Sequence, residues 1–427
     1  KLALENKLAA YNLPQGVIST IYRDTAAGKI GLITHVGLKT FVDPRLEGGK
    51  LNDKAREGED VVQLVTINGQ ERLFYKTRPI HVGVVRATYA DTHGNCTFHK
   101  EGMSNEVLAI AQAAKNSGGK VIVQVERIVE YGSLNTQMVR LPGIYVDAVV
   151  VSSPENHMQT FGTQYNPAYS GEAKVPVASL EPLPLDERKV IARRAAQELV
   201  SNAITNLGIG MPEGVAVIAA EEGLSGMVLT TEAGTIGGIP AGGKDFGVTT
   251  NPDCLVDQPY QFDFYDGGGL DVAFLGLAQM DGEGNVNVSK FGPKIAGCGG
   301  FINITQNAKK VVYCGTFTSG GLRLSIGDGK LSILQEGKVK KFLNMVEQVT
   351  FSGAYAREKG QPVLYVTERA VFELTDKGVA LREIAPGVDM ERDILALMDF
   401  KPIIDEVKLM DERIFRPENM GLAASMA

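Results

Sequence analysis

Short apolar runs rich in β-branched residues alternate along this chain with amphipathic segments. Four of the runs are predicted to be buried strands: 120–125 (KVIVQV), 145–151 (YVDAVVV), 271–277 (DVAFLGL) and 310–314 (KVVYC). Helices are predicted over Ser104–Asn116 and Asp186–Asn202, the second with an aspartate at its N-cap and an outer face rich in arginine and lysine. Alternation of this kind favours parallel sheets with crossover helices, so we predict an α/β fold with open, Rossmann-like sheets.

The chain divides into two halves of related pattern. A D-x-x-G-N turn follows an apolar strand at 91–95 and again at 281–285, and each turn is followed by a helix-like segment and another β-branched strand. Residues 152–185 contain five prolines and little periodicity, which is typical of a linker. We therefore predict an N-terminal domain over 1–185, with 152–185 as its linker, and a C-terminal domain over 186–427.

Composition and charge exclude several classes of function. The chain has 427 residues, of which 44% are apolar and 22% charged, as expected of a globular protein. A net charge of −7 and the lack of a basic run argue against a nucleic-acid partner. No apolar run approaches the roughly 20 residues that a membrane span needs. Four dispersed cysteines argue against disulfides and favour the reducing cytoplasm.

Histidine and cysteine offer little for catalysis or for a metal. His93 and His99 flank Cys96, but a structural zinc usually needs four ligands, so we predict no metal site. The remaining histidines have no serine or cysteine partner that would suggest a catalytic triad. We treat all five histidines as structural or surface residues. Asp43 and Arg45 could bind the acyl carboxylate or pair with each other, and we expect the structural pairing.

The densest cluster of candidate site residues lies between residues 204 and 243. The segment LGIGMPEG (207–214) predicts a strand end, a turn containing Gly208 and Gly210, and a helix start, an arrangement that can point free N–H groups at an anion. In LTTEAGTIGG (229–238), Glu232 ends an apolar strand. Ligands bind at the carboxyl ends of strands in open α/β sheets, and a carboxylate short of water there is a stronger nucleophile. The alternative is that Glu232 only caps the next turn.

Three further features lie downstream of Glu232. Gly267, Gly268 and Gly269 precede a predicted strand, and the loop Gly297-Cys298-Gly299-Gly300 precedes a predicted helix. Lys290 and Lys294 lie between these two glycine segments and are candidates to meet phosphates. Tight packing and solubility are the ordinary explanations for each feature taken alone.

Taken in order, these segments resemble the class I coenzyme A transferases. The matching motifs are GIGMPEG, TEAGTIGG, GGGLDVAFLGLAQMDGEGN and GCGGFINITQNAKKVV, with further agreement at 41–52, 367–372 and 384–389. The resemblance is strongest to the single-chain acetate/propionate CoA-transferases, and it covers essentially the whole chain. Family members carry a preceding Gly-rich βαβ region, so we expect the first domain to lack it in this sequence, which begins at Lys1.

The resemblance implies two α/β domains of related topology with the active site at their interface. It assigns Glu232 as the carrier of CoA, as a glutamyl-CoA thioester, and the backbone of Gly300 as a donor to the developing oxyanion. It further suggests Gly208, Gly210, Gly267, Gly268, Gly269, Gly299 and Lys290 as CoA contacts. The implied partners are acyl-CoA and short-chain carboxylates, with no permanently bound cofactor, and the implied assembly is a homo-oligomer, a dimer or tetramer.

Two alternatives remain open. An acyl-CoA hydrolase of related fold would use the same Glu232 but release the acyl group to water. A dinucleotide-binding dehydrogenase or a binding module would need G-x-G-x-x-G after its first strand. GIGMPEG has Glu213 where the third glycine is required, which argues against the dinucleotide-binding alternative.

Overall fold

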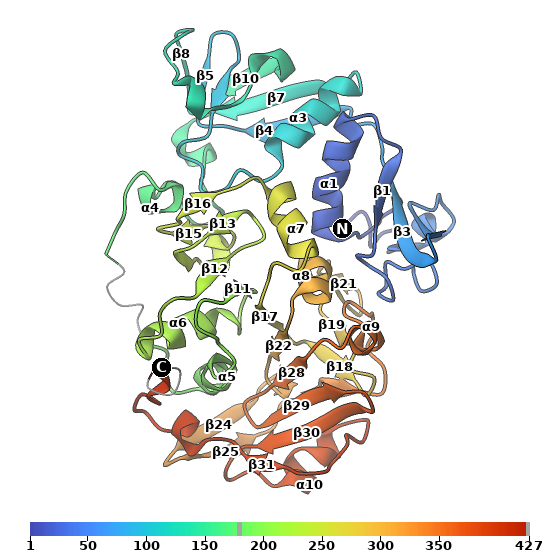
Figure 1. The fold of residues 1–427 in the computed structure, drawn as a ribbon, viewed down its shortest axis with the longest axis vertical. Helices are drawn as coiled ribbons and strands as arrows, with labels where there is room; N and C mark the ends of the chain where they lie inside the picture. Colours follow the sequence, from blue (N-terminus) through green and yellow to red (C-terminus); the bar gives the residue numbers. More distant parts are fainter. Residues whose placement is uncertain (177–181, 424–427) are drawn as a thin grey trace.

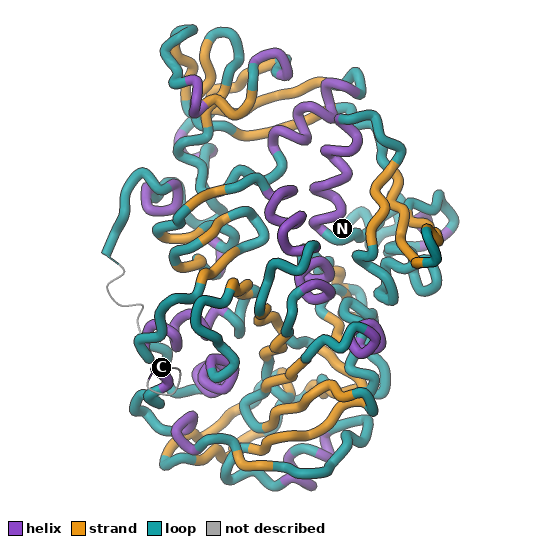
Figure 2. Tube along the Cα trace, viewed as in Figure 1, coloured by secondary structure: helices purple, strands orange, loops and turns teal. Residues whose placement is uncertain are grey.

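The computed structural model describes residues 1–176 and 182–423, which form two α/β bodies stacked along the long axis of the molecule (Figure 1). The first body contains the N-terminal residues, and the second contains a much larger sheet that continues to the C-terminal strands. Figure 2 shows that helices and strands alternate through both bodies, as the apolar pattern predicts. The prediction of an α/β fold with two related open sheets is confirmed.

The first body is built on a three-stranded parallel sheet in the order β10-β7-β4. Its strands are β4 (Val82–Arg86), β7 (Lys120–Val125) and β10 (Ala148–Val151). Alternate valines of β7 are buried under α3 (Val107–Asn116), and α3 in turn packs on α1 (Gln15–Ala26). The strand predicted over 145–151 begins three residues late, because Gly143–Tyr145 form a 3₁₀ turn.

Two small sheets accompany this body. An antiparallel meander in the order β1-β3-β2 contains β1 (Gly31–Thr34), β2 (Val62–Ile67) and β3 (Gln70–Lys76). A four-stranded sheet in the order β8-β5-β6-β9 contains β5 (Tyr89–Asp91), β6 (Cys96–Thr97), β8 (Arg127–Val129) and β9 (Val139–Leu141). The short helix α2 (Asp53–Arg56) belongs to the meander region.

The second body is built on a ten-stranded sheet in the order β16-β13-β12-β11-β17-β22-β28-β29-β30-β31. Its parallel centre contains β12 (Val228–Thr230), β11 (Ile204–Leu207), β17 (Val272–Gly276), β22 (Val311–Cys314) and β28 (Val363–Val366). The outer strands are β13 (Thr235–Ile236), β16 (Cys254–Leu255), β29 (Ala370–Thr375), β30 (Gly378–Ile384) and β31 (Lys408–Leu409).

Helices cover both faces of the parallel centre. α5 (Glu187–Ala196) and α6 (Glu213–Glu221) pack on one face, against Phe274 and Val312 among others. α7 (Gln258–Asp266) and α8 (Phe301–Asn307) pack on the other face, against Tyr313 and Tyr365. Burial on both faces explains why β17 and β22 read as continuous apolar runs.

The remaining elements are short. The small ladders comprise β14 (Ile239–Pro240) with β15 (Thr249–Thr250); β19 (Val286–Asn287), β18 (Gln279–Asp281) and β27 (Phe342–Leu343); β20 (Lys290–Phe291) with β21 (Lys294–Ile295); β23 (Thr318–Ser319) with β26 (Val339–Lys340); and β24 (Arg323–Gly327) with β25 (Lys330–Gln335). The short helices are α4 (Pro167–Ser170), α9 (Gly353–Glu358) and α10 (Met390–Asp393), and the 3₁₀ turns include η3 (Pro154–Asn156) and η4 (Gly243–Asp245).

The two halves share a duplicated unit. β4, β5 and β6 recur as β17, β18 and β19 at positions 190 residues later in the chain. In each copy the turn aspartate accepts hydrogen bonds from two backbone N–H groups and from the turn asparagine, at 2.9 Å for Asp91 and at 3.0–3.1 Å for Asp281. The turn asparagine then accepts from the N–H of Gly143 in one copy and of Gly353 in the other, at 3.0 Å in both. The predicted duplication is therefore confirmed.

The prediction that the basic side chains of α5 face outward is wrong for three of the four, since only Arg188 is exposed. Arg193 is 0% exposed, and Lys189 and Arg194 are each 6% exposed. Lys189 pairs with Glu221 at 2.7 Å and Arg194 with Glu383 at 2.8 Å. Arg193 donates instead to backbone carbonyls of the C-terminal segment, among them that of Glu418 at 2.8 Å. Because these partners come from distant segments, α5 can lie between the sheet and the C-terminal segment rather than at the surface. The helix also ends at Ala196, six residues before the predicted end.

Much of the predicted linker packs on the second body. α4 lies against β15, where the carbonyl of Ala168 accepts a hydrogen bond from Asn251 N at 2.9 Å. Lys174 donates to the carbonyl of Asn251 at 3.1 Å. Residues 177–181 of the linker lie outside the described residues. Within the described parts of the chain, no helix has the length and apolar character required to cross a membrane.

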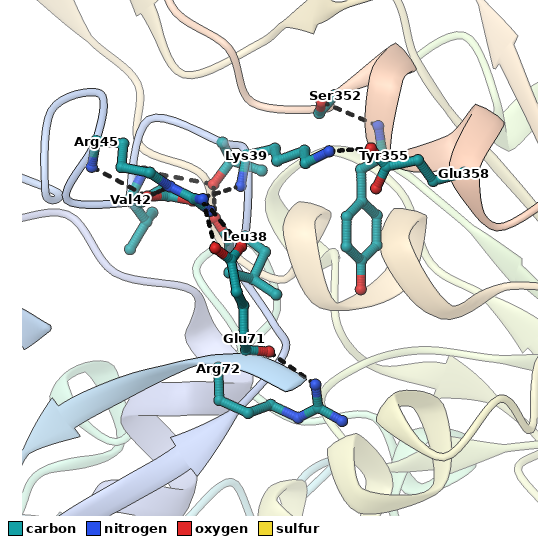
Figure 3. A network of polar contacts seen from close by, with 12 residues as sticks. Leu38, Lys39, Val42, Arg45, Glu71, Arg72, Ser352, Tyr355 and Glu358 are labelled. Carbon is teal, nitrogen blue, oxygen red and sulfur yellow. Dashed lines mark hydrogen bonds and ion pairs between the residues drawn. The ribbon is translucent and has the colours of Figure 1, made fainter. Parts of the chain in front are cut away.

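Polar side chains also join the meander region to the C-terminal half. Figure 3 shows Arg45 beside Glu71, and Lys39 paired with Glu358 of α9. Arg45 Nε donates to Asp43 Oδ1 at 3.0 Å, and a terminal nitrogen of the same guanidinium donates to Glu71 Oε2 at 2.9 Å. The expected structural pairing of Asp43 with Arg45 is therefore confirmed.

Candidate active site

Glu232 lies at the carboxyl edge of the parallel sheet, two residues after the end of β12. A tight turn follows it: Gly234 N donates to the carbonyl of Thr231 at 3.1 Å, and Gly234 has a φ of 103°. Any side chain at Gly234 would overlap the carbonyl of Val256, so the turn requires glycine. The Glu232 side chain is half-buried, and this burial raises the pKa of its carboxyl group.

A buried polar network holds the backbone that precedes Glu232. From α7, Gln261 Nε2 donates to the carbonyl of Thr231 at 3.1 Å and to Tyr265 Oη at 2.9 Å. Tyr265 Oη donates to Thr230 Oγ1 at 2.7 Å, and Asn206 Nδ2 donates to the carbonyl of Thr230 at 3.2 Å. The two residues before Glu232 are therefore held from α7 and β11, and they fix the place of the backbone that carries its side chain.

Gly300, immediately before α8, lies beside Glu232 although 68 positions separate them in the sequence. A methyl group on Gly300 would stand 3.5 Å from Glu232 Cγ and 3.1 Å from Phe262 Cζ. Among the described residues, the Gly300 N–H donates no hydrogen bond. The structure thus brings together the two residues to which the resemblance gives catalytic roles, and leaves a backbone donor available next to the carboxylate.

The first half of the chain contributes to the surroundings of this site. At the start of α1, Gln15 N donates to the carbonyl of Gly299 at 2.8 Å, and Gly16 N donates to Asn303 Oδ1 at 3.1 Å. Met103 of the first half is also near, because a methyl group on Gly247 would stand 3.4 Å from Met103 Cε and 3.7 Å from Cβ of Ala233, the residue after Glu232. The site is therefore bordered by both halves.

Some of the predicted CoA contacts share this edge of the sheet. Gly208 and Gly210 follow β11, the neighbour of β12, and Gly208 N donates to the carbonyl of Phe274 at 2.8 Å. Lys290 begins the β20–β21 hairpin, which is tied to the GCGG loop because Gly297 N donates to the carbonyl of Ser289 at 3.0 Å. Within the described residues, Lys290 forms no ion pair. Gly208, Gly210, Gly299 and Lys290 remain predicted CoA contacts.

The triple-glycine segment is not brought to Glu232. Gly267, Gly268 and Gly269 end α7 at the amino edge of the sheet, just before β17, whereas Glu232 lies at the carboxyl edge. Gly268 has a φ of 86°, and a side chain at Gly269 would overlap the Phe264 ring. The termination of the helix is enough to explain why these positions are glycine. Their role as CoA contacts stays a prediction.

The histidines lie apart from Glu232 in local contacts of their own. His93 stacks on Tyr131 with ring centroids 3.8 Å apart, and His99 Nδ1 lies 3.1 Å from Thr97 Oγ1. In the part of the chain that the structure describes, no three His, Cys, Asp or Glu side chains are grouped to hold a metal.

Sequence reasoning missed Gln261 and Tyr265. They are spaced four residues apart on α7 and are both buried. Polar groups with this spacing inside an aromatic, apolar helix are the signal that points to a buried network.

Comparison with known proteins agrees with this geometry. A family model described as coenzyme A transferase matches residues 1–152. The chain is 51% identical over 433 aligned positions to caffeate CoA-transferase of Acetobacterium woodii, covering 100% of this chain and 82% of that protein. The chain belongs to the coenzyme A transferases. It is also 46% identical to acetate CoA-transferase YdiF of Escherichia coli (strain K12), covering 99% of this chain and 79% of that protein.

A solved structure supports the same assignment. The acyl-CoA transferase YdiF of Escherichia coli O157:H7, in a thioester complex with CoA, superposes with a TM-score of 0.92 at 46% identity, covering 98% of this chain and 79% of that one. The chain is thus a class I CoA-transferase that carries both related halves on one polypeptide, and it transfers CoA between an acyl-CoA and a carboxylate.

Proposed function

We propose that this CoA-transferase works by a ping-pong exchange in which Glu232 carries CoA between short-chain carboxylic acids. A Glu232 carboxylate oxygen attacks the acyl thioester carbonyl and the C–S bond breaks. CoA leaves as a thiolate, and a mixed anhydride of Glu232 and the acyl group remains. The thiolate then attacks the glutamyl carbonyl, the anhydride C–O bond breaks, and the first carboxylate departs. An incoming carboxylate then attacks the glutamyl-CoA thioester, and the same steps in reverse release it as a new acyl-CoA and regenerate Glu232.

The observation that carries this proposal is the closeness of Gly300 to Glu232 at the carboxyl edge of the sheet, where a methyl group on Gly300 would stand 3.5 Å from Glu232 Cγ. Each step places negative charge on a carbonyl oxygen, so it needs a donor already in place. We propose that the Gly300 N–H is that donor. Partial removal of Glu232 from water weakens its solvation and makes the carboxylate a better nucleophile once it is ionised.

Two further points support the same mechanism. The YdiF relative was solved as a thioester complex with CoA. Gly208, Gly210, Gly299 and Lys290 lie near the same edge of the sheet or in the hairpin tied to the GCGG loop, where they would contact CoA. The proposed substrates are acyl-CoA and small carboxylates, and the proposed assembly is a homo-oligomer.

The test is covalent trapping. The complete protein is incubated with acetyl-CoA, trapped with borohydride or hydroxylamine, and digested for mass spectrometry. We expect modification of the peptide that contains Glu232 and none in Glu232→Ala. Binding of acetyl-CoA without any adduct at Glu232 would refute the mechanism.

The same preparation separates transfer from hydrolysis. With a transferase, added propionate accelerates the loss of acetyl-CoA and appears as propionyl-CoA. With a hydrolase, free CoA accumulates at a rate that is independent of propionate. The second result would replace the exchange mechanism with hydrolysis through the same carboxylate.

A further inference from the structure

The side chain of Asn303 joins the helices α8, α7 and α1. Asn303 lies in α8, three positions after Gly300, and is fully buried. Its Nδ2 donates to both carboxyl oxygens of Asp266, the last residue of α7, at 2.9 and 3.0 Å. Its Oδ1 accepts a hydrogen bond from Gly16 N in the first turn of α1, at 3.1 Å. One amide thus holds α8 to α7 and to the first half of the chain.

The partners of Asn303 determine how its amide is oriented. The N–H of Gly16 can only donate, so it requires the amide oxygen and turns the NH₂ group towards Asp266, which must accept. The amide packs directly on α1, because a methyl group on Gly16 would stand 2.4 Å from Asn303 Nδ2. A side chain at 303 that lacked either the donor or the acceptor would leave a buried polar group unpaired.

The two helices that Asn303 joins lead to the two groups of the proposed mechanism. α8 begins directly after Gly300, so a displacement of its first turn displaces the Gly300 N–H. α7 holds the backbone before Glu232 through two buried polar side chains, and one of them, Tyr265, is the neighbour of Asp266. The bond between Asp266 and Asn303 therefore ties the helix that holds the Glu232 backbone to the helix that begins at Gly300.

We infer that Asn303, with Asp266 as its acceptor, is a positioning residue for CoA transfer that sets the place of the Gly300 N–H relative to Glu232. The inference rests on the proposed function, because it takes these two groups as the oxyanion donor and the carrier of CoA. Asn303 takes no part in forming or breaking bonds and acts through α8.

Replacing Asn303 with leucine removes both hydrogen bonds and keeps the branching of the side chain. We expect kcat to fall about 10- to 100-fold, because a displacement of about 1 Å at a reacting group can cost about 10²-fold. KM for acetyl-CoA should stay within about twofold of wild type, since the donor acts on charge that develops in the transition state.

Asn95→Leu is the matched control. In the turn between β5 and β6, Asn95 Nδ2 donates to Asp91 at 2.9 Å and Asn95 Oδ1 accepts from Gly143 N at 3.0 Å. The same two kinds of hydrogen bond are lost there, away from α7 and α8. This variant should lose stability in thermal unfolding and keep the kcat of wild type.

An exchange of donor and acceptor separates positioning from stability. In Asn303→Asp the introduced carboxyl can still accept from Gly16 N, but it faces Asp266, so the two share a hydrogen bond only while one of them keeps a proton. We expect a kcat within about fivefold of wild type at pH 6 and a further fall of at least about tenfold by pH 8.5, where both carboxyls ionise and repel. The double variant Asp266→Asn/Asn303→Asp reverses donor and acceptor and should restore most of the kcat at pH 8.5.

Other charged groups surround this pair without bonding to it. The titratable side chains around Asp266 are Asp263 on α7, Arg23 on α1, His35 after β1, Tyr75 on β3 and Lys309 after α8. Asp263 pairs with Arg23 at 3.1 Å, and His35 Nε2 lies 2.6 Å from Asn307 Oδ1. In the described part of the chain, the Asp266 carboxyl accepts hydrogen bonds only from the amides of Asn303 and Asn307. Because wild type and Asn303→Asp share all these groups, the difference between their pH profiles reports on the introduced carboxyl.

Steady-state kinetics and covalent trapping on the same variants decide the outcome. Slower formation of the Glu232 adduct in Asn303→Leu, in proportion to its kcat, supports the inference. A wild-type kcat in Asn303→Leu, an equal fall in Asn95→Leu, or a double variant no more active than Asn303→Asp at pH 8.5 would overturn it.

The trapping experiment also separates this inference from the proposed function. If wild type forms no adduct at Glu232, the proposed function fails. If wild type forms the adduct and Asn303→Leu forms it at the same rate, only the positioning role fails. Should Asn303→Leu not fold, the pH profiles of Asn303→Asp and of the double variant decide.

Discussion

Replacing Gly300 with alanine tests the geometry of the site with a single methyl group. The new carbon would stand 3.1 Å from Phe262 Cζ and 3.3 Å from Cε1, closer than the 3.5–4.0 Å of an ordinary carbon contact. Phe262 is fully buried against Tyr265 and other core residues, so its ring has little room to retreat. Gly300 has a φ of −82°, which alanine adopts without strain. The backbone at 300 must therefore shift by a few tenths of an ångström.

That shift moves the Gly300 N–H relative to Glu232. Complete loss of one oxyanion donor costs about 10²- to 10³-fold in kcat. A partial displacement should cost less, and we expect kcat to fall about 10- to 50-fold, equivalent to about 1.4–2.3 kcal/mol of transition-state stabilisation. KM for acetyl-CoA should change by no more than about twofold. Overpacking should also lower the free energy of unfolding by about 1–3 kcal/mol.

Gly282→Ala is the matched control for this prediction. Its new methyl group would also press on a phenylalanine ring, at 3.2 Å from Cγ and Cδ2 of Phe400, but in the turn between β18 and β19. Phe400 is only partly buried, so its ring has more room to retreat than that of Phe262. Denaturant unfolding should show a smaller loss of stability in Gly282→Ala, and steady-state kinetics a loss of kcat only in Gly300→Ala. Unchanged kcat in Gly300→Ala, or an equal fall in Gly282→Ala, would refute the reasoning.

Three further predictions concern buried polar groups. Tyr265→Phe removes the hydrogen bond to Thr230 and should lower kcat about 3- to 10-fold at unchanged KM; a kcat equal to wild type in steady-state assays would count against the positioning role. Burial raises the pKa of Asp266 to about 7, against about 3.9 when unfolded, so the wild-type enzyme should lose stability as the pH rises from about 4 to 7. Asp266→Asn should flatten this dependence in thermal unfolding at pH 5 and pH 8, and an unaltered slope would contradict it. Arg194→Ala removes a buried cation and leaves the partly exposed Glu383 without its partner, so it should cost about 1–3 kcal/mol in urea unfolding, less than for a fully buried pair, whereas an unchanged free energy of unfolding would show that the pair is dispensable.

Local sequence patterns predicted the bounds of strands more successfully than they predicted which charged side chains are exposed. The strand at 120–125 has the predicted bounds, because alternate valines with one buried face define a strand without help from the rest of the chain. The basic face of α5 was misplaced for the opposite reason. Charge alone predicts that lysine and arginine side chains are exposed, and only the fold brings Glu221 to Lys189 and Glu383 to Arg194, which makes their burial possible.

At the site, too, local signals were predicted and contacts between distant segments were not. The strand end at Glu232 and the loop at Gly300 were both found from the sequence, since an apolar run followed by glycines is a local signal. Their contact could not be worked out locally, because it depends on β12 and α8 meeting at one edge of the sheet. Gln261 and Tyr265 were missed because their role depends on carbonyl groups contributed by β12.

The sequence by itself determined the alternation of strands and helices, the duplicated D-x-x-G-N turns, and the motifs that identify a coenzyme A transferase. These are properties of neighbouring residues, set by periodicity, turn chemistry and spacing. Only the tertiary structure decided that Gly300 lies against Glu232, that Gly267–Gly269 end a helix at the opposite edge, and that Asn303 joins α8 to α7 and α1. Each of those depends on segments tens of residues apart, whose meeting is fixed by the packing of the whole sheet.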